Sequence, residues 1–321
     1  MRHILFTGGA GFIGSCLCEK LLEDPKNFLV IVDNLSTGYM EKLPQKHQER
    51  YKFVNCDINV YKDISELFMS FHFDYVFHYA AVVGVKRTQE NPLMVLRDLH
   101  GFENILNLSK HSNVKRVFFS SSSEVYGEPV EFPQNEETTP LNSRIPYAIV
   151  KNVGEAFLKS YHKEYDLNYT IFRFFNTYGP KQSSDFVMSK FIKLALKNQS
   201  ITIFGDGLQT RTFCYIDDNV EATYKVFLEV LKNSEYPNEV INIGNNNETH
   251  IIDLAKIIIK LCKSTSTIKH LAPLKEGDMT RRLPDISKMK SLLQRDLMPI
   301  EEGITKVLKN TEFVLQNITS L

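Results

Sequence analysis

The stretch Thr7-Gly8-Gly9-Ala10-Gly11-Phe12-Ile13-Gly14 decides the fold. It follows a short apolar run typical of a buried strand and opens a segment with the apolar spacing of a helix. Gly8 permits a tight turn, Gly11 lets the backbone approach a pyrophosphate, and Gly14 lets helix and strand pack closely. Amides at the helix N-terminus then face the phosphate charge. The stretch therefore predicts a dinucleotide-binding turn between a strand and a helix.

A carboxylate ends the next apolar run. Asp33 lies 19 residues after Gly14, where an acidic side chain accepts hydrogen bonds from both hydroxyls of an adenosine ribose. It would repel a 2′-phosphate, which favours NAD over NADP as the cofactor. The alternative is that Asp33 only shapes a turn before Asn34.

Short apolar runs alternate with longer amphipathic segments through the first half of the chain. We expect strands at residues 3–7, 28–33, 51–56, 74–79, 115–121 and 169–173, and helices at 11–22, 61–71, 92–111 and 147–165. This order predicts an α/β fold, a doubly wound parallel sheet of the Rossmann type with helices on both faces.

After Gly179 the alternation of predicted strands and helices becomes less regular. There we expect helices at 186–196, 217–231, 251–262 and 301–314, and strands at 201–204, 210–215 and 239–243. The prediction is an NAD-binding domain of residues 1–178 plus about 216–243. A smaller, interleaved C-terminal lobe of 179–215 plus 244–321 would bind the substrate.

The composition limits the classes of partner that the protein is expected to bind. Lys and Arg number 38 and Asp and Glu number 38 in 321 residues, so no bulk field favours nucleic acid or an anionic membrane. No apolar stretch approaches the roughly 18 residues that span a bilayer, and no basic leader with a cleavage site follows Met1. We expect a cytoplasmic protein. The five cysteines form no metal-binding pattern, so we expect buried reduced thiols and no metal.

A tyrosine and a lysine lie four residues apart at the start of the predicted helix 147–165. Of the 14 tyrosines, only Tyr147 has a lysine, Lys151, at this spacing, which places both on one helix face. Oxidising a sugar carbon needs a base for the hydroxyl proton, and a free tyrosine with a pKa of about 10 is too weakly ionised. A nearby ammonium and a positive nicotinamide ring favour tyrosinate. Ser122, at the end of the preceding strand, would orient the same hydroxyl.

At this point the sequence resembles the extended short-chain dehydrogenase/reductase family, specifically its nucleotide-sugar epimerases and dehydratases. The resemblance covers nearly the whole chain. It rests on the glycine stretch, Asp33, Cys56-Asp57-Ile58, His78-Tyr79-Ala80-Ala81, Ser122–Gly127, Tyr147 with Lys151, and Arg173-Phe174-Phe175-Asn176-Thr177-Tyr178-Gly179-Pro180.

The resemblance implies roles for these residues. Tyr147 is the base, Lys151 binds the nicotinamide ribose, Ser122 binds the sugar hydroxyl, and Asp57 and Ile58 lie beside the adenine. The residues expected to bind NAD are Gly8, Gly11, Phe12, Ile13, Gly14, Asp33, Asn34, Asp57, Ile58, Ala80, Ala81, Tyr147 and Lys151. The substrate implied is a nucleotide-diphosphate sugar, as used in polysaccharide biosynthesis.

The substrate side is similar to the family as well. The loop Gly205–Arg211 looks like its nucleotide-diphosphate loop, with Arg211 as a planar charged fork on the diphosphate. Phe204 would lie near the base, and Asn176 would hydrogen-bond the phosphate region. The segment Gly277-Asp278-Met279-Thr280-Arg281-Arg282 resembles a later segment that supplies a phosphate-binding arginine, Arg282 or its neighbour Arg281. The alternative for this pair is a solvated basic turn.

Four positions bear on the reaction. Glu124 stands where dehydratases and UDP-glucuronate decarboxylases carry a catalytic glutamate, and its alternative role is to cap a turn. Ser123 stands where dTDP-glucose-type dehydratases have an aspartic acid. Lys181 replaces the arginine usual in decarboxylases. Asp98 replaces the family's common asparagine.

The leading hypothesis is a nucleotide-sugar 4-epimerase that acts through a transient 4-keto sugar. A C4 dehydrogenase, a 4,6-dehydratase and a nucleotide-uronate decarboxylase share its first step, and a non-catalytic NAD-binding sensor is a more remote alternative. The family also implies a homodimer formed through the helices at 92–111 and 147–165.

Overall fold

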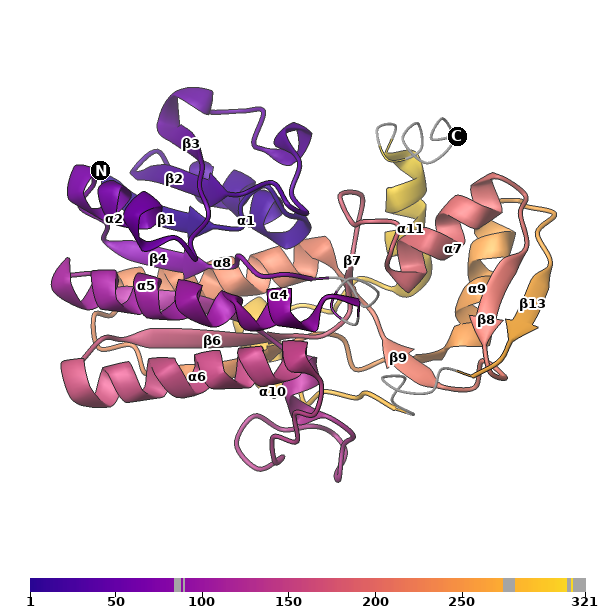
Figure 1. Cartoon of the computed structure of the whole chain (residues 1–321). Helices are drawn as coiled ribbons and strands as arrows, with labels where there is room; N and C mark the ends of the chain where they lie inside the picture. The colour runs from indigo at the N-terminus through magenta and orange to yellow at the C-terminus, as the bar shows by residue number, and fades with distance from the viewer. Residues whose placement is uncertain (84–87, 89, 274–280, 311–312, 314–321) are drawn as a thin grey trace. The chain divides into compact units, whose positions relative to one another are not determined.

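The chain folds into two compact units (Figure 1). Unit 1 comprises Met1–Val125, Ser143–Phe174 and Val220–Ile241, and unit 2 comprises Tyr126–Asn142, Phe175–Asn219 and Asn242–Leu321. The structure, a computed structural model, describes residues 1–83, 88, 90–273, 281–310 and 313.

A seven-stranded sheet in the order β11-β6-β5-β4-β1-β2-β3 organises unit 1. Its strands are β1 (Arg2–Thr7), β2 (Asn27–Asp33), β3 (Tyr51–Asn55), β4 (Tyr75–His78), β5 (Arg116–Ser122), β6 (Tyr169–Phe174) and β11 (Glu239–Ile243). Neighbouring strands from β3 to β6 run parallel. The order reverses at β1, so the predicted doubly wound parallel sheet is confirmed.

Helices cover both faces of this sheet, as Figure 1 shows. They are α1 (Phe12–Leu22), α2 (Tyr61–Ser70), α4 (Pro92–Leu96), α5 (Asp98–His111), α6 (Pro146–Tyr165) and α8 (Ile216–Lys232). On one face, α2, α5 and α6 pack over a core of mixed aliphatic and aromatic side chains. A Cβ at Gly154 of α6 would lie 2.4 Å from the Phe102 ring of α5, so only glycine allows this close packing.

Aromatic rings line the opposite face. Phe6, Phe77 and Phe118 stand on three adjacent strands with ring centroids 5.4 and 4.4 Å apart. Phe227 of α8 contacts both Phe77 and Phe118 edge-on, the geometry that aromatic quadrupoles favour. These rings bury a large apolar area and hold α8 against the sheet.

A buried ion pair anchors α6 to the sheet. Glu155 accepts two bonds from Arg173 of β6, at 3.0 and 2.7 Å, and a third of 2.6 Å from the Ser121 hydroxyl of β5. Both charged side chains are almost fully buried. Removing either one would leave the other as an unpaired buried charge, which destabilises the fold. The contact fixes α6 one turn beyond Lys151.

Unit 2 contains small sheets and short helices. Its strands are β7 (Thr177–Tyr178) with β10 (Cys214–Tyr215), β9 (Thr210–Thr212) with β12 (Glu248–His250), and β8 (Ile201–Phe204) with β13 (Ile268–Leu271). Its helices are α7 (Val187–Leu196), α9 (Ile251–Leu261), α10 (Ser287–Leu293) and α11 (Ile300–Lys309). α9 packs against both α7 and α11.

Three predicted elements were wrong in extent. The helix expected at 92–111 is divided at Arg97, where the His100 amide bonds to the Arg97 carbonyl at 3.0 Å in a tightened turn. The strand expected at 210–215 is two strands, because β9 and β10 pair with different partners. The helix expected at 301–314 ends at Lys309, because Asn310 has extended backbone that cannot continue it.

No helix in the described ranges is long and apolar enough to cross a membrane. None of the five cysteines, all of them described residues, forms a disulfide, and Cys18, Cys56 and Cys214 are buried. Burial raises the pKa of the Cys56 thiol to about 11, so this thiol is poorly nucleophilic. Among the described residues, no group of three or more His, Cys, Asp or Glu is placed to hold a metal ion.

Candidate active site

The glycine turn between β1 and α1 is tightly packed at two of its glycines. Gly8 has a φ of +76°, and a Cβ there would lie 2.6 Å from the Ala80 amide nitrogen. A Cβ at Gly14 would lie 2.3 Å from the Gly8 carbonyl oxygen, so both positions exclude any side chain. A Cβ at Gly11 would meet only this same oxygen, at 3.1 Å. The backbone at Gly11 is therefore open to a ligand at the start of α1, where Phe12 and Ile13 form the first turn.

Asp33 lies at the end of β2 beside this turn. Its Oδ2 accepts a 3.0 Å bond from the Ala10 amide, and its Oδ1 accepts a 2.9 Å bond from the Leu35 amide. Burial raises the pKa of the carboxyl group, against the effect of these two donors. Ionised carboxylate oxygens accept more than one bond each, so Asp33 shapes the turn and still has lone pairs for a ribose. Asn34 is exposed, and its Oδ1 accepts the Ser36 amide.

Gly38 also shapes this site, although its role was not predicted from the sequence. A Cβ at this position would lie 2.8 Å from Asp33 Oδ1 and 2.9 Å from Oδ2. The loop after β2 folds back so that the Tyr39 amide bonds to the Ala10 carbonyl at 3.0 Å. Gly38 therefore leaves room for the carboxylate, and only the folded loop reveals this.

The remaining predicted cofactor residues lie around the same edge of the sheet. Asp57 is partly buried and its Oδ1 accepts the Asn59 amide, whereas Ile58 is buried and its carbonyl accepts the Asn104 amide of α5. Ala80 and Ala81 are partly exposed just after β4. The Ala80 amide bonds to the Thr7 hydroxyl at 3.2 Å, so β4 ends against the glycine turn.

Ser122, Tyr147 and Lys151 come together in unit 1. Ser122 ends β5 and hydrogen-bonds the Tyr147 hydroxyl. Tyr147 follows Pro146 at the start of α6, where a proline sets the first turn. The Lys151 ammonium lies 5.8 Å from the centre of the Tyr147 ring. The serine and the lysine thus approach the same tyrosine from two elements.

Burial controls the electrostatics of this cluster. It raises the pKa of Tyr147, the Ser122 hydrogen bond opposes the increase, and the charges of Glu124 and Asp98 add to it. Burial also lowers the pKa of Lys151 to about 8. The ammonium donates to the Ser120 carbonyl at 2.6 Å. A positive charge held beside the phenol is the arrangement that favours tyrosinate.

Glu124 lies next to these residues. It is in a short 3₁₀ turn, residues 123–126, and its amide donates a 3.2 Å bond to Ser122 Oγ. Its charge raises the pKa of Tyr147. The structure therefore gives Glu124 both a place in a turn and an electrostatic effect on the tyrosine.

Three predicted substrate residues lie in or next to the strands of unit 2. Arg211 of β9 is 9% exposed, and its guanidinium donates to the Thr210 carbonyl at 2.7 Å. Asn176 donates a 3.3 Å bond to the Thr212 carbonyl, also in β9. Phe204 is partly buried at the end of β8. The first two residues are thus linked through one strand.

The two adjacent arginines have different environments. Arg281 is exposed and forms two bonds with Glu248 of β12, at 2.8 and 2.6 Å. Glu248 also accepts a 2.8 Å bond from the Thr210 hydroxyl. Arg282 is only 6% exposed, so it is not part of a solvated turn. Positions 277–280 of the predicted segment lie outside the described residues.

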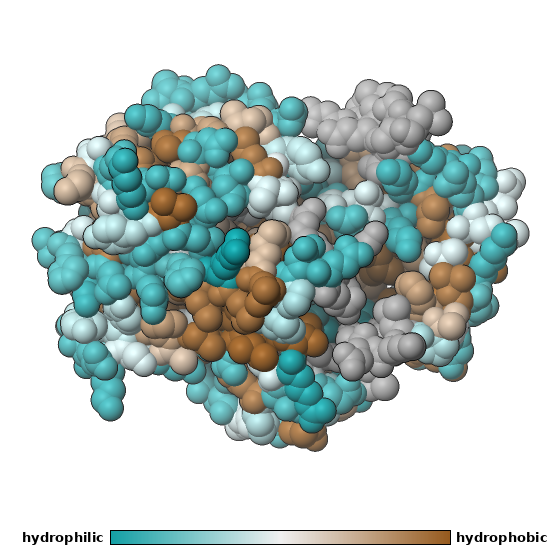
Figure 2. All heavy atoms as spheres, in the orientation of Figure 1, coloured by the Kyte–Doolittle hydropathy of each residue, from teal (hydrophilic) through white to brown (hydrophobic). Residues whose placement is uncertain are grey.

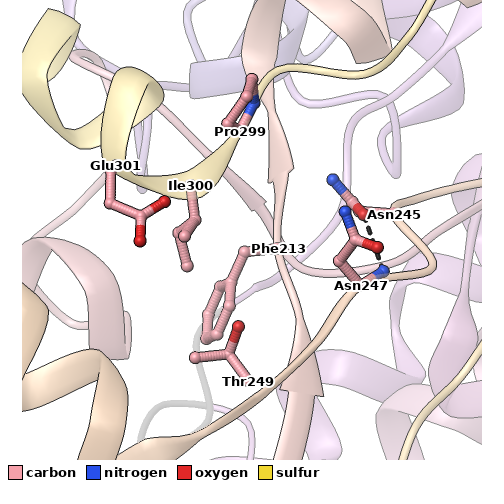
Figure 3. A pocket seen from close by; sticks show the side chains of 7 residues that line it. All are labelled: Phe213, Asn245, Asn247, Thr249, Pro299, Ile300 and Glu301. Atoms are coloured by element: carbon pink, nitrogen blue, oxygen red, sulfur yellow. Dashed lines mark hydrogen bonds between the residues drawn. The ribbon is translucent and has the colours of Figure 1, made fainter.

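A small pocket of unit 2 was not predicted (Figure 3). Its volume is about 240 Å³, and it is lined by Phe213, Asn245, Asn247, Thr249, Pro299, Ile300 and Glu301. The Asn247 amide donates a 2.8 Å bond to Asn245 Oδ1, which orders one wall. Thr249, which lines the pocket, lies on β12 opposite Arg211 on β9. The pocket and Arg211 are therefore formed by the same pair of strands.

Known proteins resemble the chain over nearly its whole length. The profile of the NAD dependent epimerase/dehydratase family matches residues 4–244. A Methanocaldococcus jannaschii protein provisionally named UDP-glucose 4-epimerase is 37% identical over 310 residues, 95% of this chain and 96% of that protein. UDP-glucuronic acid decarboxylase 6 of Arabidopsis thaliana is 34% identical, covering 91% of this chain and 83% of the relative. The crystal structure of the Thermotoga maritima UDP-glucose 4-epimerase with UDP-glucose has a TM-score of 0.89 at 31% identity, covering 99% and 100% of the two chains.

Proposed function

Because the chain belongs to the NAD-dependent epimerase/dehydratase family, we propose that it is a nucleotide-sugar 4-epimerase. The observation that carries the proposal is the contact of Ser122 with the Tyr147 hydroxyl, with the buried Lys151 ammonium on the same face of α6. This cluster can remove a proton from a sugar hydroxyl.

The proposed roles follow from the geometry. Tyr147, as tyrosinate, takes the proton of the C4 hydroxyl, and Ser122 orients that hydroxyl. The Lys151 charge stabilises the tyrosinate. NAD supplies the hydride acceptor for C4 and the donor for its return. The 4-keto sugar would then rotate and present its opposite face, and Tyr147 would return the proton to the C4 oxygen. The product therefore has the same mass as the substrate, with the configuration at C4 inverted.

The residues around the glycine turn fit NAD. The positive φ of Gly8, the open backbone at Gly11 and the buried carboxylate of Asp33 form a cradle that a side chain would fill. We assign NAD binding to the residues expected from the sequence: Gly8, Gly11, Phe12, Ile13, Gly14, Asp33, Asn34, Asp57, Ile58, Ala80, Ala81, Tyr147 and Lys151.

We assign the nucleotide diphosphate to unit 2. Arg211, Asn176 and Phe204 keep their expected roles, and Arg282 takes the second phosphate contact. Arg281 is the weaker candidate because Glu248 already accepts two of its N–H groups. Its proposed part is to hold β12 beside β9, next to Arg211.

Decarboxylation of a nucleotide uronate is the second candidate. The effect of Glu124 on Tyr147 favours it, since a carboxylate beside the base can move protons next to a ketone. The 34% identical Arabidopsis relative is a decarboxylase by name. Against it, Lys181 replaces the arginine expected for carboxylate recognition.

We also propose that the chain is a cytoplasmic homodimer. Leu93 and Leu96 of α4 and Ile149 of α6 are 74%, 38% and 39% exposed, and α4 packs on α6. Figure 2 shows the corresponding area as a brown patch. Exposed apolar patches of this kind support an interface, and light scattering tests it: a monomer at micromolar concentration contradicts the dimer.

Product mass tests the function. The purified chain is incubated with NAD and a panel of UDP-, GDP-, CDP- and dTDP-sugars, and products are separated and weighed. An unchanged mass with altered retention supports epimerisation. Loss of carbon dioxide, water or two hydrogens identifies a decarboxylase, a dehydratase or a dehydrogenase instead. No conversion of any sugar contradicts the proposal and leaves the sensor alternative.

A further inference from the structure

The pocket of unit 2 has a buried carboxamide on one wall with an unused donor (Figure 3). Asn245 lines the pocket and is only 4% exposed. Its Oδ1 accepts the 2.8 Å bond from the Asn247 amide, which fixes the orientation of the carboxamide. Among the residues that the structure describes, its Nδ2 group has no hydrogen-bond partner. Because buried polar groups are normally paired, this donor indicates a ligand that supplies an acceptor.

An acceptor lies on the other side of the pocket. Glu301 is in the first turn of α11, and Figure 3 shows it on the opposite side of Phe213 from Asn245 and Asn247. Its carboxylate forms no hydrogen bond or ion pair with another described residue. The Thr249 hydroxyl, beside the Phe213 ring, is likewise unbonded within the described ranges, and it can both donate and accept. The pocket therefore offers donors on one wall and an acceptor on the other.

Apolar groups supply the rest of the lining. They are Phe213, Pro299 and Ile300, and the volume that they help to enclose is about 240 Å³. Pockets for drug-sized ligands have volumes of about 300–1,000 Å³, so this pocket has room for one six-membered ring and not for a whole nucleotide. The negative face of an aromatic ring such as Phe213 attracts the C–H groups of a saturated ring.

The charge of the lining disfavours anions. Glu301 is the only ionisable group among the described lining residues, so a phosphate or a carboxylate would be repelled with no cation to offset the repulsion. Arg211 lies opposite Thr249 but does not line the pocket. A simple ammonium ligand would pair with Glu301, but it has no lone pair for the Asn245 donor. A ligand that fits both walls is uncharged, and it carries donors and acceptors on one small ring.

We propose that this pocket binds a free, uncharged monosaccharide, at a site additional to the proposed site of the nucleotide sugar. Each sugar hydroxyl both donates and accepts, so one ring can donate to Glu301 and accept from Asn245 while its C–H groups pack on Phe213. A sugar linked to a diphosphate fits less well, because the diphosphate would bring negative charge close to Glu301.

Methyl NMR of the full chain saturated with NAD observes the pocket directly. Ile300 and Thr249 carry methyl groups and line the pocket, and the variants Ile300→Val and Thr249→Ser identify their signals. The chain is titrated separately with glucose, galactose, xylose and N-acetylglucosamine. We expect at least one of these sugars to shift both signals with a Kd of about 1–10 mM, the affinity of a ligand of this size. The absence of a shift with all four sugars overturns the proposal.

A matched pair of variants tests the acceptor. Glu301→Ala and Glu302→Ala each remove one carboxylate from the first turn of α11, so their effects on the helix are similar, but only Glu301 lines the pocket. We expect Glu301→Ala to raise the Kd of the sugar about tenfold or more, because a hydrogen bond to a charged group is lost. Glu302→Ala should leave the Kd unchanged. Equal affinity in the two variants overturns the proposal.

Two further probes distinguish other ligands. The sugar titration is repeated with saturating UDP, and we expect the same Kd. Loss of sugar binding in the presence of UDP assigns the pocket to the nucleotide sugar and overturns the proposal. Shifts with ethanolamine but with none of the sugars indicate a cation site and also overturn it. Because none of these titrations needs turnover, their result stands even if the chain converts no nucleotide sugar and the proposed function fails.

Discussion

Replacing Lys151 with methionine changes stability in a pH-dependent way. Burial lowers the pKa of the ammonium from its ordinary 10.5 to about 8, and each tenfold change in proton affinity is worth about 1.4 kcal/mol. Holding the charge in the folded protein therefore costs about 3 kcal/mol. Because the folded pKa is below the unfolded one, the full penalty applies below pH 8 and disappears as the pH rises to 10.5. Wild-type stability gains this amount across that window, and the variant does not.

A second effect of this substitution is independent of pH. The variant loses the 2.6 Å bond to the Ser120 carbonyl, and a buried acceptor without a partner costs about 1–3 kcal/mol. At pH 7 the two effects nearly cancel or leave the variant slightly more stable. By pH 11 the variant is the less stable protein.

Urea unfolding of the two NAD-free proteins from pH 7 to pH 11 measures the difference. We expect the stability of the variant relative to wild type to fall by about 3 kcal/mol over this range. Lys159→Met, an exposed position on the same helix, serves as the control because that ammonium stays in water. A difference between Lys151→Met and wild type that is constant with pH would refute the reasoning.

Three further substitutions test the site. Tyr147→Phe should lower kcat by about 10²–10⁴ with NAD still bound, whereas Tyr161→Phe on the same helix, which loses a 2.9 Å bond to Asn107, should keep full activity. Equal activity in the two variants contradicts the role of Tyr147. Gly14→Ala should lose NAD on gel filtration and lose about 1–3 kcal/mol of stability, because its Cβ would lie 2.3 Å from a backbone oxygen. If the Gly14→Ala variant retains NAD, the close packing of this turn is contradicted. Arg211→Gln should raise KM for a nucleotide-diphosphate sugar tenfold or more through loss of a charged bond of about 1.5–3 kcal/mol, and an unchanged KM assigns the diphosphate elsewhere.

The sequence predicted most of unit 1, because each of its elements is long enough to show a period. The strands from β1 to β6 and the helices α1, α2 and α6 lie within a residue or two of the expected ranges. The glycine turn was predictable for a different reason. Gly8 and Gly14 have no steric alternative once the strand and helix are placed.

Short elements that depend on partners distant in sequence were not predictable. Two-residue strands such as β7 and β10 carry no period, and they exist because they pair across 36 residues. Residues from Arg211 to Ile216 are all buried, so the alternation that would reveal a break at Phe213 is missing. The division at Arg97 lies next to Asp98, which accepts a bond from the distant Val82 amide, and a contact of this kind leaves no periodic signal in the sequence.

The candidate site shows the same contrast. Ser122, Tyr147 and Lys151 were predictable because their chemistry requires certain residue types at a certain spacing. Gly38 and the difference between Arg281 and Arg282 were not, because both depend on which partner a folded loop brings near. Glu248, which lies 33 residues before Arg281, decides that difference by accepting two of its N–H groups.

The burial of Lys151 indicates that its ammonium group has a functional role. A methionine would fill the same space beside Phe119 without the penalty of about 3 kcal/mol that the ammonium incurs below pH 8. The chain instead has a lysine there, and Glu155 one turn further along the helix bonds to Arg173 of β6 and Ser121 of β5. It also holds a second buried carboxylate, Asp98, on the neighbouring helix. Lys151 and Asp98 are thus two buried charged groups around one tyrosine, and both lower stability. Such groups are expected where a charge takes part in the chemistry, since strain and unfavourable electrostatics persist mainly at functional sites.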